Sequence, residues 1–168
     1  MREVTAKVKF RPRTEEDDVF LLSVGRRVFS AWSRDPARAL AAMLVESGAR
    51  AEVAWVSEAR VGFFIVGLDV LPRPFGPWVR PAVARLDAIA VVPGAQSRGI
   101  GRALLVRAEK VATDRGAVVM SLMTASTNGK ARKLFSRAGF LSLVTLPRSY
   151  ANGDAAVEMF KALDVASE

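Results

Sequence analysis

Two periodicities of apolar residues run along this chain, and together they predict a mixture of strands and helices. Alternating or continuous apolar runs predict strands at residues 4–10, 51–57, 61–71, 88–92, 118–124, 140–146 and 155–163. Apolar residues at helical spacing predict helices at residues 15–30, 36–47, 100–115 and 128–138. This succession indicates one α/β domain over residues 1–168, with a mixed, mostly antiparallel sheet of about seven strands and about four helices.

Residues 87–115 form the most informative stretch, because they predict a strand, a glycine-rich turn and a helix in succession. The apolar run 88–92 ends at Pro93, and the turn then contains Gly94, Gly99 and Gly101. A helix N-terminus carries unpaired N–H groups and a partial positive charge, and glycine lets an anion approach the backbone closely. The stretch therefore predicts a phosphate or pyrophosphate site, although a plain tight turn uses the same glycines.

Positive charge is concentrated in one part of the chain. The net charge is +8, and the region 98–137 holds nine basic residues against only two acidic ones, Glu109 and Asp114. The basic residues are Arg98, Arg102, Arg107, Lys110, Arg115, Lys130, Arg132, Lys133 and Arg137. Two interpretations stay open: a solvated helix face, or attraction of a polyanionic ligand to this half of the molecule.

The chain contains no histidine and no cysteine. Disulfides, thiolate catalysis, Cys/His metal sites and the commonest general base are thereby excluded, and we expect no metal. Proton transfer is left to carboxylates, the single tyrosine (Tyr150), lysines, hydroxyls or water. No apolar run approaches the ~18 residues of a membrane span, and the charged start MREVTAKVKF lacks the apolar region of a signal peptide, so we expect a cytoplasmic protein.

Two motifs in this sequence resemble those of the GNAT superfamily of N-acetyltransferases. The turn Gln96-Ser97-Arg98-Gly99-Ile100-Gly101 is similar to its acetyl-CoA motif, Gln/Arg-x-x-Gly-x-Gly/Ala, which follows a central strand. The second motif, Asn-x-x-Ala-x-x-Leu-Tyr-x-x-x-Gly-Phe, is matched except at one position by Asn128, Ala131, Leu134, Phe135, Gly139 and Phe140. The ribosomal-protein N-terminal acetyltransferases are the most similar group. The resemblance implies a GNAT fold whose sheet splits between its fourth and fifth strands.

This resemblance implies direct transfer of acetyl from acetyl-CoA to a primary amine, either a protein N-terminal α-amine or a small-molecule amine. Main-chain groups of Ile89, Ala90 and Val91 would bond the pantetheine and polarise the thioester carbonyl. The pyrophosphate would lie on the amides of Gln96, Ser97, Arg98, Gly99, Ile100, Gly101 and Arg102. Asn128 and Phe135 of the second motif complete the expected cofactor site, and Asn128 is also a suitable helix cap.

The usual catalytic positions of the family are altered here. Phe135 replaces the tyrosine that often acts as general acid, and Met123 stands where the ribosomal-protein enzymes have a glutamate base. Asp87 is our candidate base, with an ion pair to Arg85 or to a loop arginine as the structural alternative. Tyr150 is our candidate for protonating the leaving thiolate, and it also suits gripping the substrate or packing.

The acceptor is constrained by the absence of a strong base. Deprotonating a lysine at pH 7 costs roughly 4.6 kcal/mol, and an α-amine with a pKa near 8 costs about 1.4 kcal/mol. An acceptor of low pKa is therefore favoured. In the GNAT fold the connection between the first two helices lines the acceptor cleft, so Trp32, Arg34 and Asp35 would either contact the substrate or pack.

Three further points stay open at this stage. The proline-rich stretch 72–81, PRPFGPWVRP, predicts a stiff connection or a rim over the acceptor site. A catalytically degenerate acyl-CoA-binding module is the alternative to an active enzyme. Nucleic-acid binding through the basic half is a weaker hypothesis, since the arginines are not interleaved with stacking aromatics. We expect acetyl-CoA and a peptide or small-molecule amine as partners, no membrane, and either a monomer or a homodimer.

Overall fold

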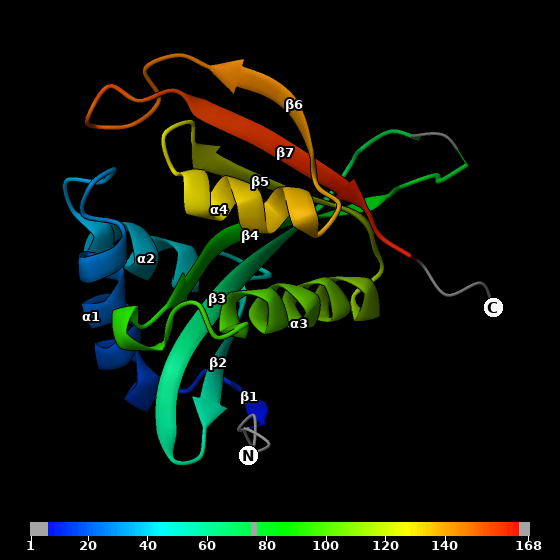
Figure 1. Cartoon of the computed structure of the whole chain (residues 1–168). Helices are drawn as coiled ribbons and strands as arrows, with labels where there is room; N and C mark the ends of the chain where they lie inside the picture. Colours follow the sequence, from blue (N-terminus) through cyan, green and yellow to red (C-terminus); the bar gives the residue numbers. More distant parts are fainter. Residues whose placement is uncertain (1–6, 75–76, 165–168) are drawn as a thin grey trace.

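The computed structural model describes residues 7–74 and 77–164, and these form seven strands and four α-helices (Figure 1). In chain order the elements are β1 (Val8–Pro12), the 3-10 turn η1 (Glu15–Asp17), α1 (Asp18–Val28), α2 (Pro36–Val45), β2 (Arg50–Val56), β3 (Ala59–Val70), β4 (Ala82–Val91), the 3-10 turn η2 (Pro93–Ala95), α3 (Ile100–Asp114), β5 (Ala117–Ala125), α4 (Gly129–Arg137), β6 (Leu141–Leu146) and β7 (Ala156–Ala162).

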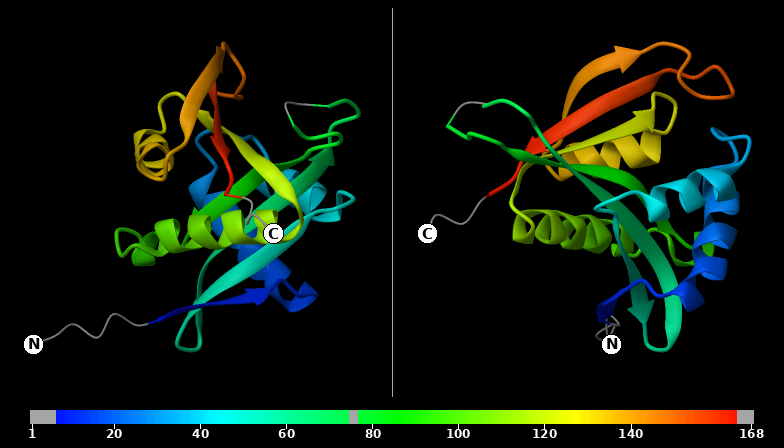
Figure 2. Two further views of the ribbon diagram at one scale, coloured as in Figure 1. Left: turned by 90° about the vertical axis from the view of Figure 1, so that its right-hand side faces the viewer. Right: turned by 180° about the vertical axis from the view of Figure 1, so that it is seen from behind.

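A single sheet runs in the order β1-β2-β3-β4-β5-β7-β6. Among the described strands only β4 and β5 pair in parallel, so the expected mixed and mostly antiparallel sheet is confirmed. The β4–β5 pairing ends at Leu86 and Leu122, although β4 continues to Val91 and β5 to Ala125. The two strands diverge beyond that point, which confirms the predicted split (Figures 1 and 2).

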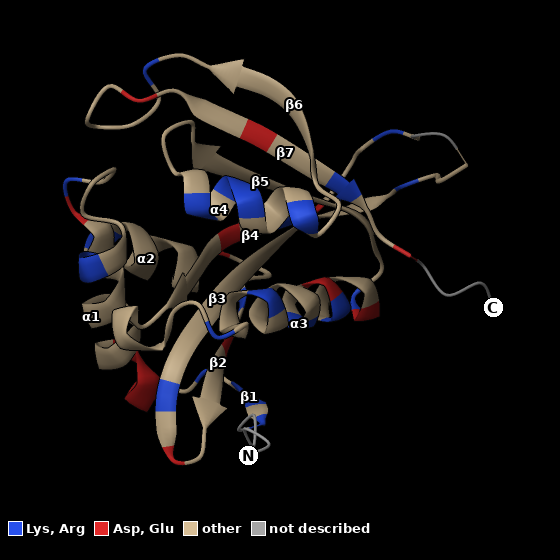
Figure 3. Ribbon diagram, in the orientation of Figure 1, with Lys and Arg blue, Asp and Glu red and all other residues tan. Residues whose placement is uncertain are grey.

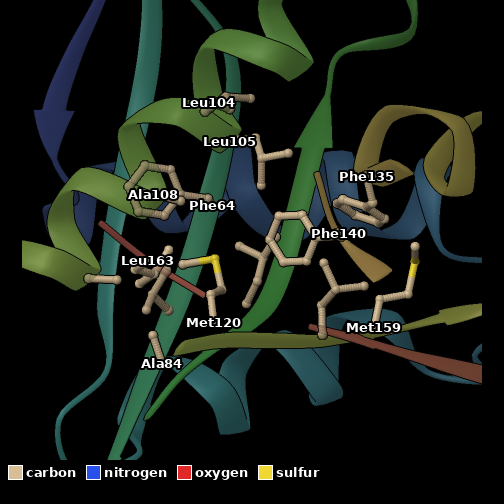
Figure 4. Close-up of a cluster of buried hydrophobic side chains, with 14 of the residues drawn as sticks. Phe64, Ala84, Leu104, Leu105, Ala108, Met120, Phe135, Phe140, Met159 and Leu163 are labelled. Atoms are coloured by element: carbon tan, nitrogen blue, oxygen red, sulfur yellow. The ribbon is translucent and has the colours of Figure 1, made fainter. Parts of the chain in front are cut away.

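Helices cover both faces of the sheet (Figure 2). On one face α3 and α4 pack over a cluster that includes Phe64, Leu104, Leu105, Met120 and Phe135 (Figure 4). On the other face α1 and α2 pack over a smaller cluster that includes Leu21, Leu40, Phe63 and Ile65. Each fully buried Leu, Ile or Phe contributes about 1.5–3 kcal/mol through loss of water contact, so the two clusters hold the layers together.

A β-bulge interrupts β4 at the level of the split. Ile65 pairs with Ala88 and Val66 pairs with Leu86, so Asp87 has no partner on β3. The extra residue reverses the alternation of faces: Leu86 belongs to the α3–α4 cluster, whereas Ala88 belongs to the α1–α2 cluster. The bulge thereby places Asp87 beside the open part of the sheet.

Several predicted boundaries were wrong. The first helix is preceded by η1 and spans Asp18–Val28, and the first strand is Val8–Pro12, with residues 4–6 of its predicted range lying outside the described residues. β4 begins at Ala82, six residues before the predicted start, because Arg85 and Asp87 neutralise each other within the strand. The proline-rich stretch is irregular where it is described; Phe75 and Gly76 lie outside the described residues.

Candidate functional site

The turn between β4 and α3 exposes main-chain donors to open space. Ser97 and Gly99 adopt left-handed φ values of 64° and 79°, and no side chain in the described part of the chain caps α3 at its N-cap, Gly99. A Cβ added to Gly99 would meet no atom within 4 Å, so nothing in the described structure covers the turn there. Arg98 and Arg102 are both exposed beside it. Uncapped amides, the positive end of a helix and two guanidiniums suit a phosphate or pyrophosphate group.

The strand that leads into this turn has one unpaired edge. Residues 87–91 of β4 lie beyond the end of the pairing with β5, so main-chain groups on that side have no partner among the described strands. The Gln96 side-chain amide donates to the carbonyl of Val91 at 3.3 Å and holds the turn against the strand end. A Cβ on Gly101 would lie 3.5 Å from Leu134 and 3.9 Å from Val91, so β4, α3 and α4 meet here. A surface pocket of about 450 Å³ lies alongside Gly99 and Arg102.

The two second-motif residues have structural roles of their own. Asn128 is the N-cap of α4 and accepts a hydrogen bond from the amide of Ala131 at 3.3 Å, which confirms the helix-cap interpretation. Phe135 is only 4% exposed and packs edge-to-face on Phe140, with 5.9 Å between ring centroids. Contact of either residue with a cofactor remains a prediction.

Asp87 lies in an ion network on the α1–α2 face of the sheet. Its Oδ1 accepts from Arg85 Nε at 3.1 Å, which confirms the ion-pair alternative, and Arg85 also binds Glu46 at 2.7 Å and Asp69 at 2.5 Å. Opposite Arg85 on β3 stands Gly67, where a Cβ would lie 2.9 Å from Asp87 Oδ2, so glycine makes room for the pair. Burial raises the pKa of Asp87, and the Arg85 hydrogen bond and charge oppose that rise only in part.

The connection between α1 and α2 is fastened to the connection between β6 and β7. Trp32 Nε1 donates to Asp154 Oδ2 at 3.2 Å, and the amide of Ala151 donates to the Trp32 carbonyl at 3.4 Å. The hydroxyl of Thr127, which precedes α4, also donates to Asp154, and this bond is the main cause of the lowered pKa of Asp154. We call Trp32, Thr127 and Asp154 the clasp. The clasp links the α1–α2 connection to the connections β5–α4 and β6–β7, and the three connections lie on the same side of the molecule in Figure 1.

The other predicted acceptor-side residues lie around the clasp. Tyr150 follows β6 in the same connection and is half-buried, and burial raises the pKa of its phenol. Asp35 is the N-cap of α2 and accepts from the amide of Arg38 at 3.1 Å, so its observed role is capping. Arg34 is exposed.

Comparisons with known proteins agree with this geometry. The sequence model described as "Acetyltransferase (GNAT) family" matches residues 16–140. This chain belongs to the GNAT acetyltransferase family. Among solved structures, the ribosomal-protein-S18-alanine N-acetyltransferase from Escherichia coli has a TM-score of 0.77 at 22% identity, covering 96% of this chain and 97% of that one. Arabidopsis thaliana NAA60 in complex with acetyl-CoA has a TM-score of 0.78 at 17% identity, covering 93% and 98%.

A curated relative matches only a segment of this GNAT chain. Mycothiol acetyltransferase from Beutenbergia cavernae is 41% identical over 59 residues, which is 35% of this chain and 20% of the relative. The chain thus spans about a fifth of the length of that relative. The two structural neighbours are below 25% identity, so they establish the fold alone.

The basic surplus is less uniform than the sequence indicated. Arg107 pairs with the buried Glu52 of β2 at 2.7 and 2.9 Å, so its charge is balanced by an acidic residue from outside the region 98–137. Lys110 pairs with Asp114, and Glu109 pairs with Lys161 at 2.5 Å. Apart from Lys110, the exposed basic residues of the region 98–137 are Arg98 and Arg102 at the turn and Lys130, Arg132, Lys133 and Arg137 on α4 (Figure 3). Positive charge therefore gathers around the predicted cofactor site.

One acidic residue near the split was missed by the sequence reading. Glu158 on β7 is the direct cross-strand partner of Met123 on β5. Strand register is set by tertiary pairing, and the only sequence signal was a single charge inside the otherwise apolar stretch 155–160.

Residues 7–74 and 77–164 contain no group of three or more acidic, histidine or cysteine side chains arranged to hold a metal ion. None of the described helices has the length and apolar character needed to cross a membrane.

Proposed function

We propose that this GNAT protein transfers the acetyl group of acetyl-CoA directly to a primary amine, with a protein or peptide α-amine as the favoured acceptor class. The observation that carries the proposal is the unpaired edge of β4, residues 87–91, which opens beside the uncapped N-terminus of α3. A strand edge offers donors and acceptors to an amide-containing arm, and the helix terminus offers donors to a diphosphate. Pantetheine and pyrophosphate are joined in this way in coenzyme A.

The residues around the turn suit such a cosubstrate. Amides from Gln96 to Arg102 would hold the pyrophosphate, with the guanidiniums of Arg98 and Arg102 beside it. Main-chain groups of residues 89–91 would bond the pantetheine and polarise the thioester carbonyl. Acetyl-CoA supplies an acyl group already activated as a thioester, so the protein has to position the amine and manage its protons.

Asp87 and Tyr150 are the proposed proton acceptor and donor. An ordinary aspartate is a poor base near pH 7, and burial brings the pKa of Asp87 closer to the working range. Burial of Tyr150 keeps its phenol protonated, as a donor to the leaving thiolate must be. Asp87 lies in β4 at the split, and Tyr150 lies in the connection that the clasp fastens to α1–α2.

An α-amine suits this site better than a lysine. Neither Asp87 nor Tyr150 is a strong base. An α-amine costs less free energy to deprotonate than a lysine, so a weak base is sufficient for it. The Escherichia coli structural relative carries the name of a ribosomal-protein-S18-alanine N-acetyltransferase, which is the same acceptor class.

A degenerate acyl-CoA-binding module is the second candidate, favoured by Phe135 in the core and Met123 on β5 at the family's catalytic positions. Release of CoA thiol in the presence of an amine panel separates the two. An enzyme gives amine-dependent thiol release that falls in Asp87→Asn and Tyr150→Phe while acetyl-CoA affinity is kept. A binding module gives calorimetric affinity without turnover.

A further inference from the structure

Glu158 occupies a defined place on the face of the sheet that carries Asp87. Met123 and Glu158 are direct partners in the antiparallel β5–β7 pair, and direct partners project from the same face. Their neighbours Leu122 and Met159 belong to the α3–α4 cluster on the opposite face. Glu158 therefore projects toward the α1–α2 side, where the acceptor is proposed to bind (it is the red segment of the otherwise mostly tan β7 in Figure 3).

Glu158 also stands level with Asp87. Arg85 and Ser121 are partners in the parallel β4–β5 pair, so two residues further along each strand come Asp87 and Met123, just past the end of pairing. At this level of the sheet, Asp87 lies on β4 at one edge of the split and Met123 lies on β5 at the other edge. Glu158 lies on β7, the next strand after β5. Paired strands lie about 4.8 Å apart, so Glu158 is one strand spacing behind Met123.

The carboxylates of Asp87 and Glu158 differ in their hydrogen-bond and ion-pair partners. Asp87 is held by Arg85, and its side chain is 14% exposed. Glu158 is half-buried, and no described residue forms a hydrogen bond or ion pair with its carboxylate. Phe160, Met123 and Val144 are the residues placed beside it on β7, β5 and β6 by the strand register. A carboxylate with apolar neighbours and no cation of its own suits a cationic ligand.

We propose that Glu158 binds the ammonium group of the incoming acceptor above Met123 and holds its nitrogen at the split, within reach of Asp87. This inference rests on the proposed function and narrows the substrate class to amines that arrive with a positive charge, such as peptide N-termini.

The test compares KM and kcat for two acceptors with the full chain. Glu158→Gln is expected to raise KM for a cationic peptide α-amine about tenfold with kcat changed less than threefold. KM for hydroxylamine, which is uncharged at pH 7, should stay unchanged. Glu58→Gln, on the exposed β2–β3 turn, is the matched control and should leave both constants unchanged.

A double variant that moves the carboxylate from β7 to β5 distinguishes loss of the carboxylate from a general loss of folding. Glu158→Met should show the same rise in KM. Adding Met123→Glu to this variant should reverse at least half of the rise, because the carboxylate then lies on β5 at the edge of the split. Equal changes for the charged and uncharged acceptors, or no change in Glu158→Gln, would overturn the inference. Absence of turnover by the wild-type chain with any amine is a different result, which refutes the proposed function itself.

Discussion

Arg85 and Asp87, two residues apart in β4, form an ion pair with 3.1 Å between Nε and Oδ1. The bulge in β4 and the missing side chain at Gly67 make the pair fit. The candidate base of the site is thus partly neutralised by a cation that also binds Glu46 and Asp69. Its proton affinity is set by the balance of burial against that cation.

Replacing Arg85 by methionine should move the acidic limb of the pH profile to higher pH. Burial already raises the pKa of Asp87, Glu46 and Asp69 push it further up, and Arg85 is the group that lowers it. Without the cation the pKa rises more, so a larger fraction of Asp87 is protonated and inactive at a given acidic pH. The measurement is kcat/KM against pH, with Arg26→Met at an exposed position of α1 as control. An unmoved limb would show that Asp87 does not accept the proton.

The clasp should make stability depend on pH through Asp154. Its pKa is lowered, chiefly by the hydrogen bond from Thr127, so its contribution is present above the ordinary aspartate pKa of about 4 and is lost as pH falls through the lowered value. Asp154→Asn should therefore have a lower Tm than the wild type at pH 7, and the difference should shrink below about pH 4. Thermal unfolding from pH 3 to 7 measures this. A Tm difference that is constant with pH would contradict it.

Glu52 and Arg107 connect β2 to α3, and breaking this pair should destabilise the fold. Glu52 is 7% exposed, so Arg107→Ala leaves a buried carboxylate without its partner. We expect a loss of roughly 2–4 kcal/mol in the free energy of unfolding, reduced from the fully buried case because Arg107 is partly exposed. Urea unfolding measures the loss. The double variant Arg107→Met/Glu52→Met should recover most of it, and equal losses in both variants would argue against the ion pair.

The turn before α3 should bind acetyl-CoA in a salt-dependent way. Arg98→Ala and Arg102→Ala are each expected to raise Kd by about 3–10-fold at low salt, and the effect should diminish as salt screens the phosphates. Calorimetric titration with acetyl-CoA measures Kd, with Arg26→Ala as the matched control. Unchanged affinity in the double variant Arg98→Ala/Arg102→Ala would place the diphosphate elsewhere.

Local sequence signals predicted the parts of this molecule that depend on local physics. The turn 96–102, the α4 cap at Asn128 and the split beyond Leu86 follow from glycine spacing, side-chain capping and family motifs. Partners brought by tertiary pairing could not be read in this way. The β4 bulge at Asp87 and the Met123–Glu158 register are products of strand alignment.

Charges were misjudged for the same reason. The Arg107 side chain lies on a helix with exposed basic neighbours, and nothing in its local sequence points to Glu52, which is 55 residues away. The Arg85–Asp87 pair was among the alternatives, but the apolar run 88–92 alone predicted too late a start for the strand, which continues through both charged residues.

The most direct test is amine-dependent release of CoA thiol from acetyl-CoA by the wild-type chain, comparing a lysine-free peptide that has a free N-terminus with the same peptide N-acetylated and carrying one lysine. We predict that both peptides release thiol faster than the uncatalysed reaction does. We also predict that kcat/KM is at least tenfold higher for the free α-amine, in line with the difference of roughly 3 kcal/mol in deprotonation cost. Thiol release no faster than without protein, at acetyl-CoA concentrations that saturate binding, would contradict acetyl transfer by this site.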